Sequence, residues 1–274
     1  MGRKDTYRRG TRAILAAVAI IAAMNPLTAQ SQAHPEEGLS QLETAVEPLR
    51  RGITESQVFA ALSTHNEQRR SALHDYSVLR TYQVVDLRGK MHAEEIGRMR
   101  FLSPDKKTFA VASEAGSGLV RRMALNPLIR SEIEAAAGKE HHDSAISPEN
   151  YSLDLLGEQQ VGSYRCFVAE AIPRRKDKYL FAGKLWIDVN DYSVVRIEGH
   201  PAKKLSFWIE RAEFVRQYQN IDGFWLPQKD QTLVQVRLYG KKILTIEHHD
   251  YIVNAGRTKD GRTDAQEDAI AQVN

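Results

Sequence analysis

Two pairs of histidines are the residues of this 274-residue chain whose types best suit metal chemistry. Each pair precedes an aspartate, in the strings "KEHHD" and "IEHHD": His141, His142, Asp143, His248, His249 and Asp250. A structural zinc site needs three or four convergent ligands, and neither string has the H-E-x-x-H or C-x-x-C spacing. His248 and His249 stand in a strand-like run, where successive side chains point to opposite faces. We therefore expect no metal and no cofactor.

Catalytic motifs are equally hard to find. The chain has no G-x-S-x-G, P-loop or dinucleotide-binding glycine pattern. The string "SEAGSGLV" (113–120) has two glycines but lacks the Lys-Ser/Thr of a P-loop, so we interpret it as a loop. Asp188 and Asp191 are interpreted as a surface residue and a turn residue. We predict that the protein is not an enzyme; a hydrolase that brings scattered carboxylates together in space is the alternative.

Several aromatic side chains raise a further possibility, a stacking platform for sugars. They are Trp186, Trp208, Trp225, Tyr218, Phe224 and Tyr239. Aromatic residues are also enriched in strands, where their side chains pair with those of the neighbouring strand. We favour this structural interpretation.

The N-terminal residues indicate export. A cationic leader precedes a continuous apolar run from Ala13 to Met24. This run is shorter than the ~20 residues that a spanning helix needs. Small residues follow it, and cleavage after Ala29 or Ala33 fits a secretory signal. We predict a signal peptide over 1–33 and a periplasmic location; a retained membrane anchor is the alternative.

Charge and cysteine content narrow the class of protein further. Residues 1–33 hold five of the 38 basic and one of the 35 acidic residues, which leaves 33 basic against 34 acidic. A protein without a basic excess is poorly suited to neutralise phosphates, so we expect no nucleic-acid partner. The single cysteine, Cys166, lies in the strand-like run "YRCFVAEAI" and is expected to be a buried, inert thiol.

The elements that must position any site begin with a helix. Thr54 is a suitable N-cap, with Gln57 three residues later as the partner of a capping box. Apolar residues then recur near helical spacing, which predicts an amphipathic helix from about Glu55 to Leu73. A second helical segment, from Leu119 to Asp143, interrupts the strands that follow.

From Tyr76 the apolar period changes to two, which is typical of β-strands. The predicted strands cover 76–87, 94–103, 107–114, 151–161, 164–173, 178–189, 193–199, 205–218, 223–228, 231–240 and 242–253. The turn signals among them include Gly162-Ser163, Asn190-Asp191, Asp222-Gly223 and Gly240-Lys241. Strands that such short turns join are antiparallel.

Alternation along these strands predicts a curled sheet. In the string "KLWIDV", Leu185 and Ile187 alternate with Lys184, Trp186 and Asp188, so one face is expected to be apolar and the other solvated. A sheet of about ten strands tends to curl. We predict an α+β fold, a large antiparallel sheet curled into an incomplete β-barrel. The N-terminal helix and the helical insertion, acting as a lid, are expected to cover it.

The concave face of such a sheet would form a hydrophobic cavity. Its predicted wall residues are Leu185, Ile187, Val195, Ile197, Val234, Val236 and Leu238. The predicted inner stripe of the lid is Met123, Leu125, Leu128, Ile129 and Ile133. Burying apolar surface contributes ~25 cal/mol per Å², so this cavity could bind a lipid chain without any catalytic group.

The strings "GKLWIDVNDYSVVRIEG", "YQNIDGFWLPQ" and "VRLYGKKILTIEHHDY", together with the order of the elements, resemble the LolA-like superfamily. These are periplasmic outer-membrane lipoprotein-sorting proteins and their relatives. The resemblance covers roughly 55–253. It implies one LolA-like half-barrel domain (55–254). Composition predicts the rest of the chain: a signal peptide (1–33), a polar segment (34–54) and a disordered tail (255–274) without a core pattern. The lid strings "VRRM" and "LIRSEIE" are more charged than a purely apolar lid requires.

The resemblance also implies a function. Its members hold acyl chains under helices that act as a lid, and they have no catalytic residues to carry over. The expected partners are lipid acyl chains or lipoproteins, with an envelope membrane protein as a further candidate, and the expected state is a monomer. The alternative within the same fold is a regulatory or scaffold module that binds a protein partner.

Overall fold

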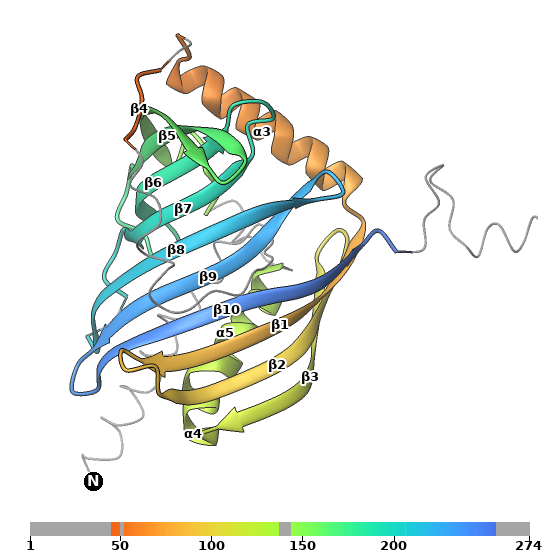
Figure 1. Cartoon of the computed structure of the whole chain (residues 1–274), viewed down its shortest axis with the longest axis vertical. Coiled ribbons are helices and arrows are strands. Elements are labelled where there is room, and N and C mark those ends of the chain that lie inside the picture. The colour runs from red at the N-terminus through yellow and green to blue at the C-terminus, as the bar shows by residue number, and fades with distance from the viewer. Residues whose placement is uncertain (1–44, 50–51, 137–143, 206, 256–274) are drawn as a thin grey trace, which may run out of the picture.

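The computed structural model describes residues 45–49, 52–136, 144–205 and 207–255. Within them, one antiparallel sheet curls around a helical segment (Figure 1). Its strands are β1 (Asp75–Asp86), β2 (Met91–Leu102), β3 (Lys106–Gly116), β4 (Tyr151–Val161), β5 (Tyr164–Pro173), β6 (Phe181–Asp188), β7 (Val194–Pro201), β8 (Ile209–Ile221), β9 (Phe224–Val236) and β10 (Gly240–Val253). The helices are α3 (Glu55–Ala72), α4 (Gly118–Val120), the π-helical turn η1 (Arg121–Leu125) and α5 (Asn126–Ala136). The predicted signal peptide, His141, His142 and Asp143, and all of the predicted tail except Ala255 lie outside the described residues.

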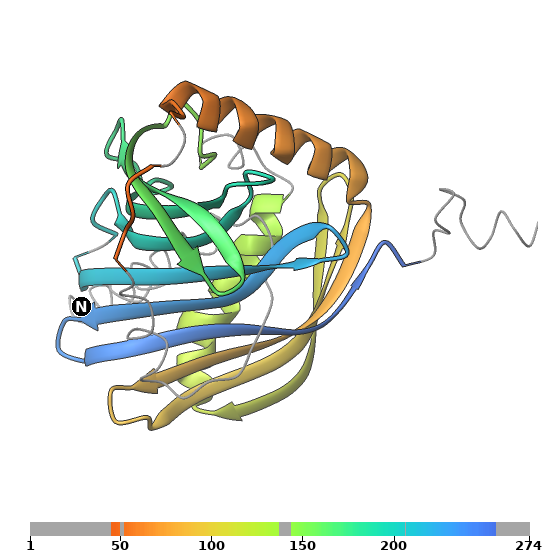
Figure 2. The ribbon, with the colours of Figure 1, turned by 45° about the horizontal axis from the view of Figure 1, so that its top comes forward.

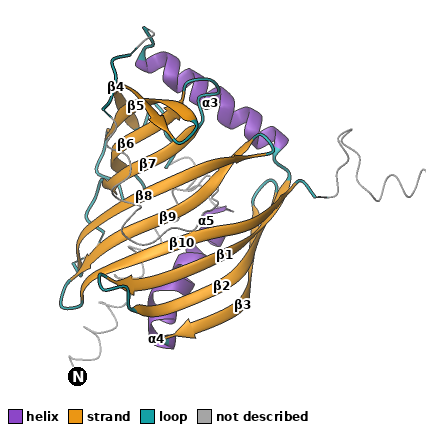
Figure 3. Ribbon diagram, viewed as in Figure 1, coloured by secondary structure: helices purple, strands orange, loops and turns teal. Residues whose placement is uncertain are grey.

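The order of the strands leaves the sheet open. The ten strands run β3-β2-β1-β10-β9-β8-β7-β6-β5-β4, so every pair of neighbouring strands is consecutive in the sequence except β1 and β10. Strands β3 and β4 are the two edges, and the helical insertion lies between them in the sequence. The predicted fold, an antiparallel sheet curled into an incomplete barrel with two helical covers, is confirmed (Figures 1 and 3).

A capping box begins α3, as the sequence predicts. The Oγ1 atom of Thr54 accepts a hydrogen bond from the N–H of Gln57, and the Oε1 atom of Gln57 accepts one from the N–H of Thr54. These bonds satisfy donors that the first turn of a helix leaves unpaired. The buried side chains of α3, Val58, Phe59 and Leu62, all join the core.

Helix α3 lies across the sheet, from edge strand β4 toward the start of β1 (Figures 1 and 2). Near its first turn, the Glu55 carboxylate accepts a hydrogen bond of 2.9 Å from the N–H of Leu153 in β4. Further along, the Nε2 atom of His65 lies 2.9 Å from the Oγ atom of Ser193, just before β7. The helix therefore links strands that lie far apart in the sheet order.

The helical insertion lies inside the curl. Segments η1 and α5 pack against the inner side chains of β1, β2 and β10 (Figure 2). Gly97 of β2 helps to make room there, because a Cβ atom at this position would meet the Phe109 ring at 2.3 Å. The ring of Phe109, from β3, contacts Tyr82 edge-on, with 5.7 Å between the ring centroids.

One predicted strand break is wrong. The sequence predicts separate strands over 223–228 and 231–240, but β9 continues from Phe224 to Val236. The polar string "QKDQ" between the two predicted strands is typical of a loop. Its Asp230, however, is buried and forms an ion pair with Arg216 of β8. A buried ion pair, rather than an apolar side chain, occupies the strand at this point.

The predicted solvated face of the β6–β7 hairpin is also wrong. Trp186 and Asp188, expected to face water, are only 7% and 3% exposed. The Trp186 Nε1 atom donates to Gln159 of β4, and the guanidinium group of Arg196 lies 5.6 Å from the Trp186 ring centroid. The Asp188 carboxylate accepts a hydrogen bond from the N–H of Asn190, which holds the predicted turn. Side chains are therefore buried on both faces of this hairpin.

Candidate functional site

Five predicted wall residues lie in one buried cluster beneath α3. Leu185 and Ile187 of β6 are fully buried, and Val195, Ile197 and Val234 are buried in the same cluster. The register places Leu185 opposite Ile197 on the neighbouring strand. The structure therefore brings these apolar side chains together, as the alternation predicts.

The last two predicted wall residues differ from each other. Val236 ends β9 and packs, half-buried, at the margin of the cluster. Leu238 is 85% exposed, with a φ of +70°, in the turn between β9 and β10. Its predicted place in the wall is wrong, because β9 ends at Val236, before the predicted strand end at 240.

The predicted lid stripe covers the inner face near β1 and β10. Leu125, Leu128 and Ile129 are buried, and Met123 and Ile133 are half-buried. All of these except Met123 belong to the same part of the core as the strand side chains Tyr82, Val84, Ala93, Leu244 and Ile246. The segment therefore lies where the sequence places it, with its apolar side on the sheet.

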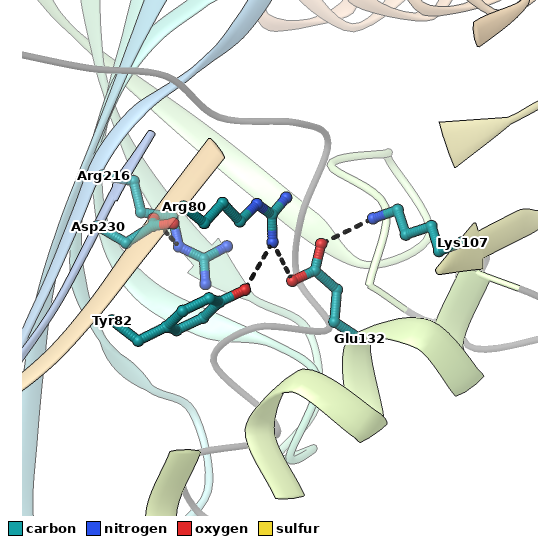
Figure 4. Close-up of polar contacts among 6 residues, drawn as sticks. All are labelled: Arg80, Tyr82, Lys107, Glu132, Arg216 and Asp230. Atoms are coloured by element: carbon teal, nitrogen blue, oxygen red, sulfur yellow. Dashed lines mark hydrogen bonds and ion pairs between the residues drawn. The ribbon is translucent and has the colours of Figure 1, made fainter. Parts of the chain in front are cut away.

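A buried carboxylate on α5 adds an ionic contact to this apolar interface. The Oε2 atom of Glu132 lies 2.5 Å from the Nη1 atom of Arg80 in β1, and its Oε1 atom lies 2.8 Å from the Nζ atom of Lys107 in β3 (Figure 4). The same Arg80 nitrogen donates to the hydroxyl of Tyr82 at 3.1 Å. Glu132 thus ties α5 to two strands by bonds that water barely reaches.

The two cations keep Glu132 ionised. Burial by itself would raise the pKa of this carboxyl, but the attraction of Arg80 and Lys107 and their hydrogen bonds outweigh it and lower the pKa to about 2. Burial lowers the pKa of Lys107, and the Glu132 carboxylate outweighs this effect and raises it. All three groups are therefore charged near neutral pH.

A second buried ion pair lies beside the first (Figure 4). The Nε atom of Arg216 lies 3.1 Å from the Oδ1 atom of Asp230, and both side chains are buried. Burial raises the pKa of Asp230, while the charges of Arg216 and Arg80 oppose that change. The fully buried His248 lies opposite Arg80 in the register. Its pKa is well below the ordinary value because of burial and the nearby Arg80 charge, so it is neutral.

Acid sensitivity should follow from Glu132. Its folded-state pKa of about 2 lies below its ordinary value of 4.5, so its ion pairs contribute fully above about pH 4.5 and are lost as the pH falls toward 2. We expect the free energy of unfolding, measured with urea at several pH values, to fall across this window. The raised pKa of Asp230 changes the free energy of unfolding in the opposite direction as the pH falls. The contribution of Glu132 is therefore isolated by comparing the wild type with Glu132→Gln.

In the Glu132→Gln variant, the free energy of unfolding should fall less at acid pH than in the wild type, because no carboxylate is left at this position to be protonated. Glu134→Gln changes an exposed residue of the same helix and should behave as the wild type. Identical pH profiles for the wild type and Glu132→Gln would show that the carboxylate is not paired.

A serine–histidine pair near α3 lacks the arrangement of a catalytic triad. Ser193, 2.9 Å from His65, is only 2% exposed. The Asp191 carboxylate accepts hydrogen bonds from the N–H of Ser193 and from the Trp225 indole, which fixes the turn. Burial, the largest effect, lowers the pKa of His65. The pair therefore has the geometry of a structural link between α3 and the β6–β7 hairpin.

Other candidate groups have structural surroundings. Burial raises the pKa of the Cys166 thiol to about 12, with smaller contributions from Asp188 and Asp191, so the thiol stays protonated. His248 faces the interior and His249 is half-exposed, which confirms that they lie on opposite faces of β10. In the described part of the chain, no group of three or more His, Cys, Asp or Glu residues is arranged to hold a metal ion. Nor does any helix there have the length and apolar character to cross a membrane.

The aromatic residues do not share one surface. Trp186, Trp225 and Tyr218 are buried, whereas Tyr239 is 63% exposed in the β9–β10 turn. Trp225 contacts the ring of Tyr164 edge-on, at 4.6 Å between centroids. These three aromatics are therefore part of the core, although the Trp225–Tyr164 contact joins β9 and β5, which are not neighbouring strands.

Solved structures of the LolA superfamily are similar to this chain. A domain assigned to outer membrane lipoprotein sorting, from Vibrio parahaemolyticus, has a TM-score of 0.44 and 12% identity over 79% of this chain and 99% of that chain. A LolA superfamily protein from Nitrosomonas europaea has a TM-score of 0.38 and 12% identity over 78% and 100%.

A chain of the MucA/MucB complex of Pseudomonas aeruginosa is also similar, with a TM-score of 0.25 and 12% identity over 74% of this chain and 96% of that chain. No family model and no curated protein matches the sequence.

The buried charges are the part of the site that the sequence analysis missed: Arg80, Lys107, Glu132, Arg216 and Asp230. One signal was present in the alternation. Arg80 stands between Val78 and Tyr82 at a position where an inward apolar residue is expected. A second signal was the charged string "LIRSEIE" on the lid, which contains Glu132.

Proposed function

We propose that this chain is an exported, non-catalytic binding protein of the cell envelope, which carries the acyl chains of lipids or lipoproteins on the concave face of its sheet. The observation that supports this most is the position of α5. This 11-residue helix lies with its apolar side on the inner face of a sheet that does not close on itself. A segment that covers an apolar face without belonging to the sheet can give way to another apolar molecule.

The contacts of α5 suit such an exchange. Apart from Glu132, its buried long side chains are the apolar Leu128 and Ile129. Apolar contacts need no directional partner, and an acyl chain that buries the same surface regains ~25 cal/mol per Å². In this proposal the chain lies along the face that α5 leaves. It extends toward the wall residues Leu185, Ile187, Val195, Ile197, Val234 and Val236.

The proposed location is the periplasm, and the proposed working form is a monomer. The location rests on the leader pattern of residues 1–33. It agrees with the outer-membrane assignment of the similar Vibrio domain.

One feature favours a second candidate function, the binding of a protein partner. Strand β3 is an edge of the sheet, and no described strand pairs with its outer side. Its Val111 is 53% exposed. An exposed edge can accept a strand from another chain, as a regulatory or scaffold module would require.

A fluorescent fatty acid tests the carrier proposal. We expect a dansyl-labelled fatty acid to bind the mature protein with increased, blue-shifted emission. Hydrogen exchange of residues 126–136 should be faster than that of β6 and β10, because a lid must open more easily than the sheet. Addition of the fatty acid should speed exchange in α5 and leave β6 unchanged. If the probe does not bind and α5 exchanges as slowly as the strands, the carrier proposal is overturned. The binding of a protein partner is then the favoured function.

A further inference from the structure

We infer that Arg80 and Lys107 form a site for the anionic head of an amphiphilic ligand, and that Glu132 occupies the place of this head while α5 is docked. The inference rests on the proposed function, because the ligand must displace α5. It adds the chemical class of the ligand: an apolar chain that ends in a carboxylate or a phosphate.

The geometry of the three residues supports this site. Each Glu132 oxygen contacts a different cation, Arg80 at 2.5 Å and Lys107 at 2.8 Å. The two cations come from β1 and β3, and the carboxylate comes from the movable segment (Figure 4). A ligand carboxylate or phosphate has the same pair of acceptor oxygens and can take over both contacts.

The charge balance after α5 leaves also favours an anion. Three buried cations, Arg80, Lys107 and Arg216, then face one carboxylate of the inner network, Asp230, which already pairs with Arg216. His248 adds no charge because burial keeps it neutral. Glu95 of β2 is buried on the same strand face as Gly97, and its pKa is raised by burial and by Glu114, so it compensates poorly.

The apolar surroundings of the site also favour an anionic ligand over a neutral one. Strand side chains of the same part of the core, such as Tyr82, Leu244 and Ile246, stay beside this region when α5 leaves. Breaking a buried pair leaves an uncompensated charge, which is strongly unfavourable. A neutral ligand would leave Lys107 in that state, whereas an anionic one would not.

Three ligands with the same ten-carbon chain test the inference: decanoate, decyl phosphate and decanol. Each would displace Nile red, a neutral probe, from the mature protein at pH 8. We expect decanoate or decyl phosphate to displace the probe at a concentration at least about tenfold below that of decanol, as a charge-assisted hydrogen bond would produce. The more effective of the two anions identifies the head group.

Lys107→Met should narrow the difference in concentration between the anions and decanol. Decanol itself should displace the probe at a lower concentration than from the wild type, because α5 loses one of the ionic contacts that hold it on the sheet. Lys106→Met alters the exposed neighbour of Lys107 and should keep the wild-type preference. Equal displacement by all three ligands in the wild type would overturn the inference and leave the proposed function intact. Failure of every ligand to displace the probe would overturn the proposed function as well.

A second inference rests on a different part of the surface and does not depend on the cargo. At the end of the sheet where β1 leads into β2, exposed large apolar side chains gather: Leu87, Met91, Leu119, Phe207, Leu238 and Tyr239. We propose that this end, the apolar rim, docks on an anionic membrane surface.

Backbone contacts make the rim continuous. The β1–β2 and β9–β10 turns are neighbours, because Asp86 pairs with Lys242 in the register. The N–H of Arg237 donates to the carbonyl of Trp208, which joins the β9–β10 turn to the segment before β8. The α4 end adjoins β2 through a bond from the N–H of Ser117 to the carbonyl of His92.

The charge of the rim complements an anionic surface. Its exposed basic residues are Arg88, Lys90, Lys203, Lys204 and Lys241. The nearby carboxylates are engaged: Asp86 accepts hydrogen bonds from backbone N–H groups of its own turn, and Glu210 pairs with Arg237. Exposed apolar tips among cations are typical of segments that insert at the surface of anionic membranes.

Vesicle sedimentation tests the apolar rim. We expect the mature protein to bind vesicles rich in phosphatidylglycerol and to release them at high salt. It should not bind vesicles of pure phosphatidylcholine. The double substitution Leu238→Ser and Tyr239→Ser, and Lys241→Glu separately, should each weaken binding about tenfold. Leu102→Ser and Lys106→Glu make matched changes in the β2–β3 turn, at the other end of the strands, and should bind as the wild type. Equal binding by rim and control variants, or no vesicle binding, would overturn this inference.

Discussion

Arg80→Met is expected to lower the free energy of unfolding by about 3–5 kcal/mol, the usual cost of breaking a buried ion pair. The substitution leaves the Glu132 carboxylate with Lys107 alone, in a site where both acidic and basic side chains are almost fully buried. Urea unfolding at neutral pH measures the change. A surface pair provides the matched control: Arg211→Met removes the partner of Glu213, but Arg211 is 77% exposed, so little change is expected.

A double-mutant cycle measures the interaction between Arg80 and Glu132 separately from their interactions with other residues. Glu132→Leu combined with Arg80→Met replaces both charges by apolar side chains, and such replacements of buried pairs are often nearly neutral. The double variant should therefore be more stable than Arg80→Met alone, with a positive coupling energy. If Arg80→Met costs no more than Arg211→Met, Glu132 does not hold α5 in the way the distances indicate.

Leu185→Asp should destabilise the protein far more than Leu128→Asp, although both leucines are almost fully buried. Leu185 belongs to a central strand, so its new carboxylate cannot reach water without breaking the sheet, and a loss of several kcal/mol is expected. Leu128 lies on α5. If α5 can leave the sheet, it takes the charge into water, and the cost is limited to the free energy of docking that helix.

Urea unfolding of both variants measures this difference, and fatty-acid binding adds a second readout. Leu128→Asp should strengthen the binding of the dansyl-labelled fatty acid, because the acyl chain takes the face that α5 leaves and a weakly docked α5 competes less for it. Leu128→Ala keeps the site apolar and serves as the control for lost packing. Equal losses of stability in Leu185→Asp and Leu128→Asp would show that α5 is a fixed part of the core, and the carrier proposal would lose its route of access.

Local signals in the sequence predicted most of the elements. The capping box of Thr54 and Gln57 gave the start of α3, and alternation gave β4 and β5 with the bounds that the structure has. These features depend on neighbours in the chain, so they can be read from short strings. The single strand β9 was missed because its polar middle is explained only by Arg216, on another strand.

The charged part of the site depends on distant neighbours. Glu132 is 52 residues from Arg80 and 25 residues from Lys107 in the sequence. No spacing rule connects residues so far apart, and the curl of the sheet alone brings them together. The burial on both faces of the β6–β7 hairpin was missed for the same reason, because Trp186 is covered by Gln159 and Arg196 from other strands.

The pairing of β1 with β10 has a consequence for the order of folding. Each meander can form as its own turns appear, but the sheet becomes continuous only when its last strand, ending at Val253, joins the first. The side chain of Asn254 completes this junction by accepting a hydrogen bond from the N–H of His74. The chain therefore cannot complete its sheet until β10 has been made and is free to pair with β1. Truncation before β10 would leave two meanders with no strand to connect them.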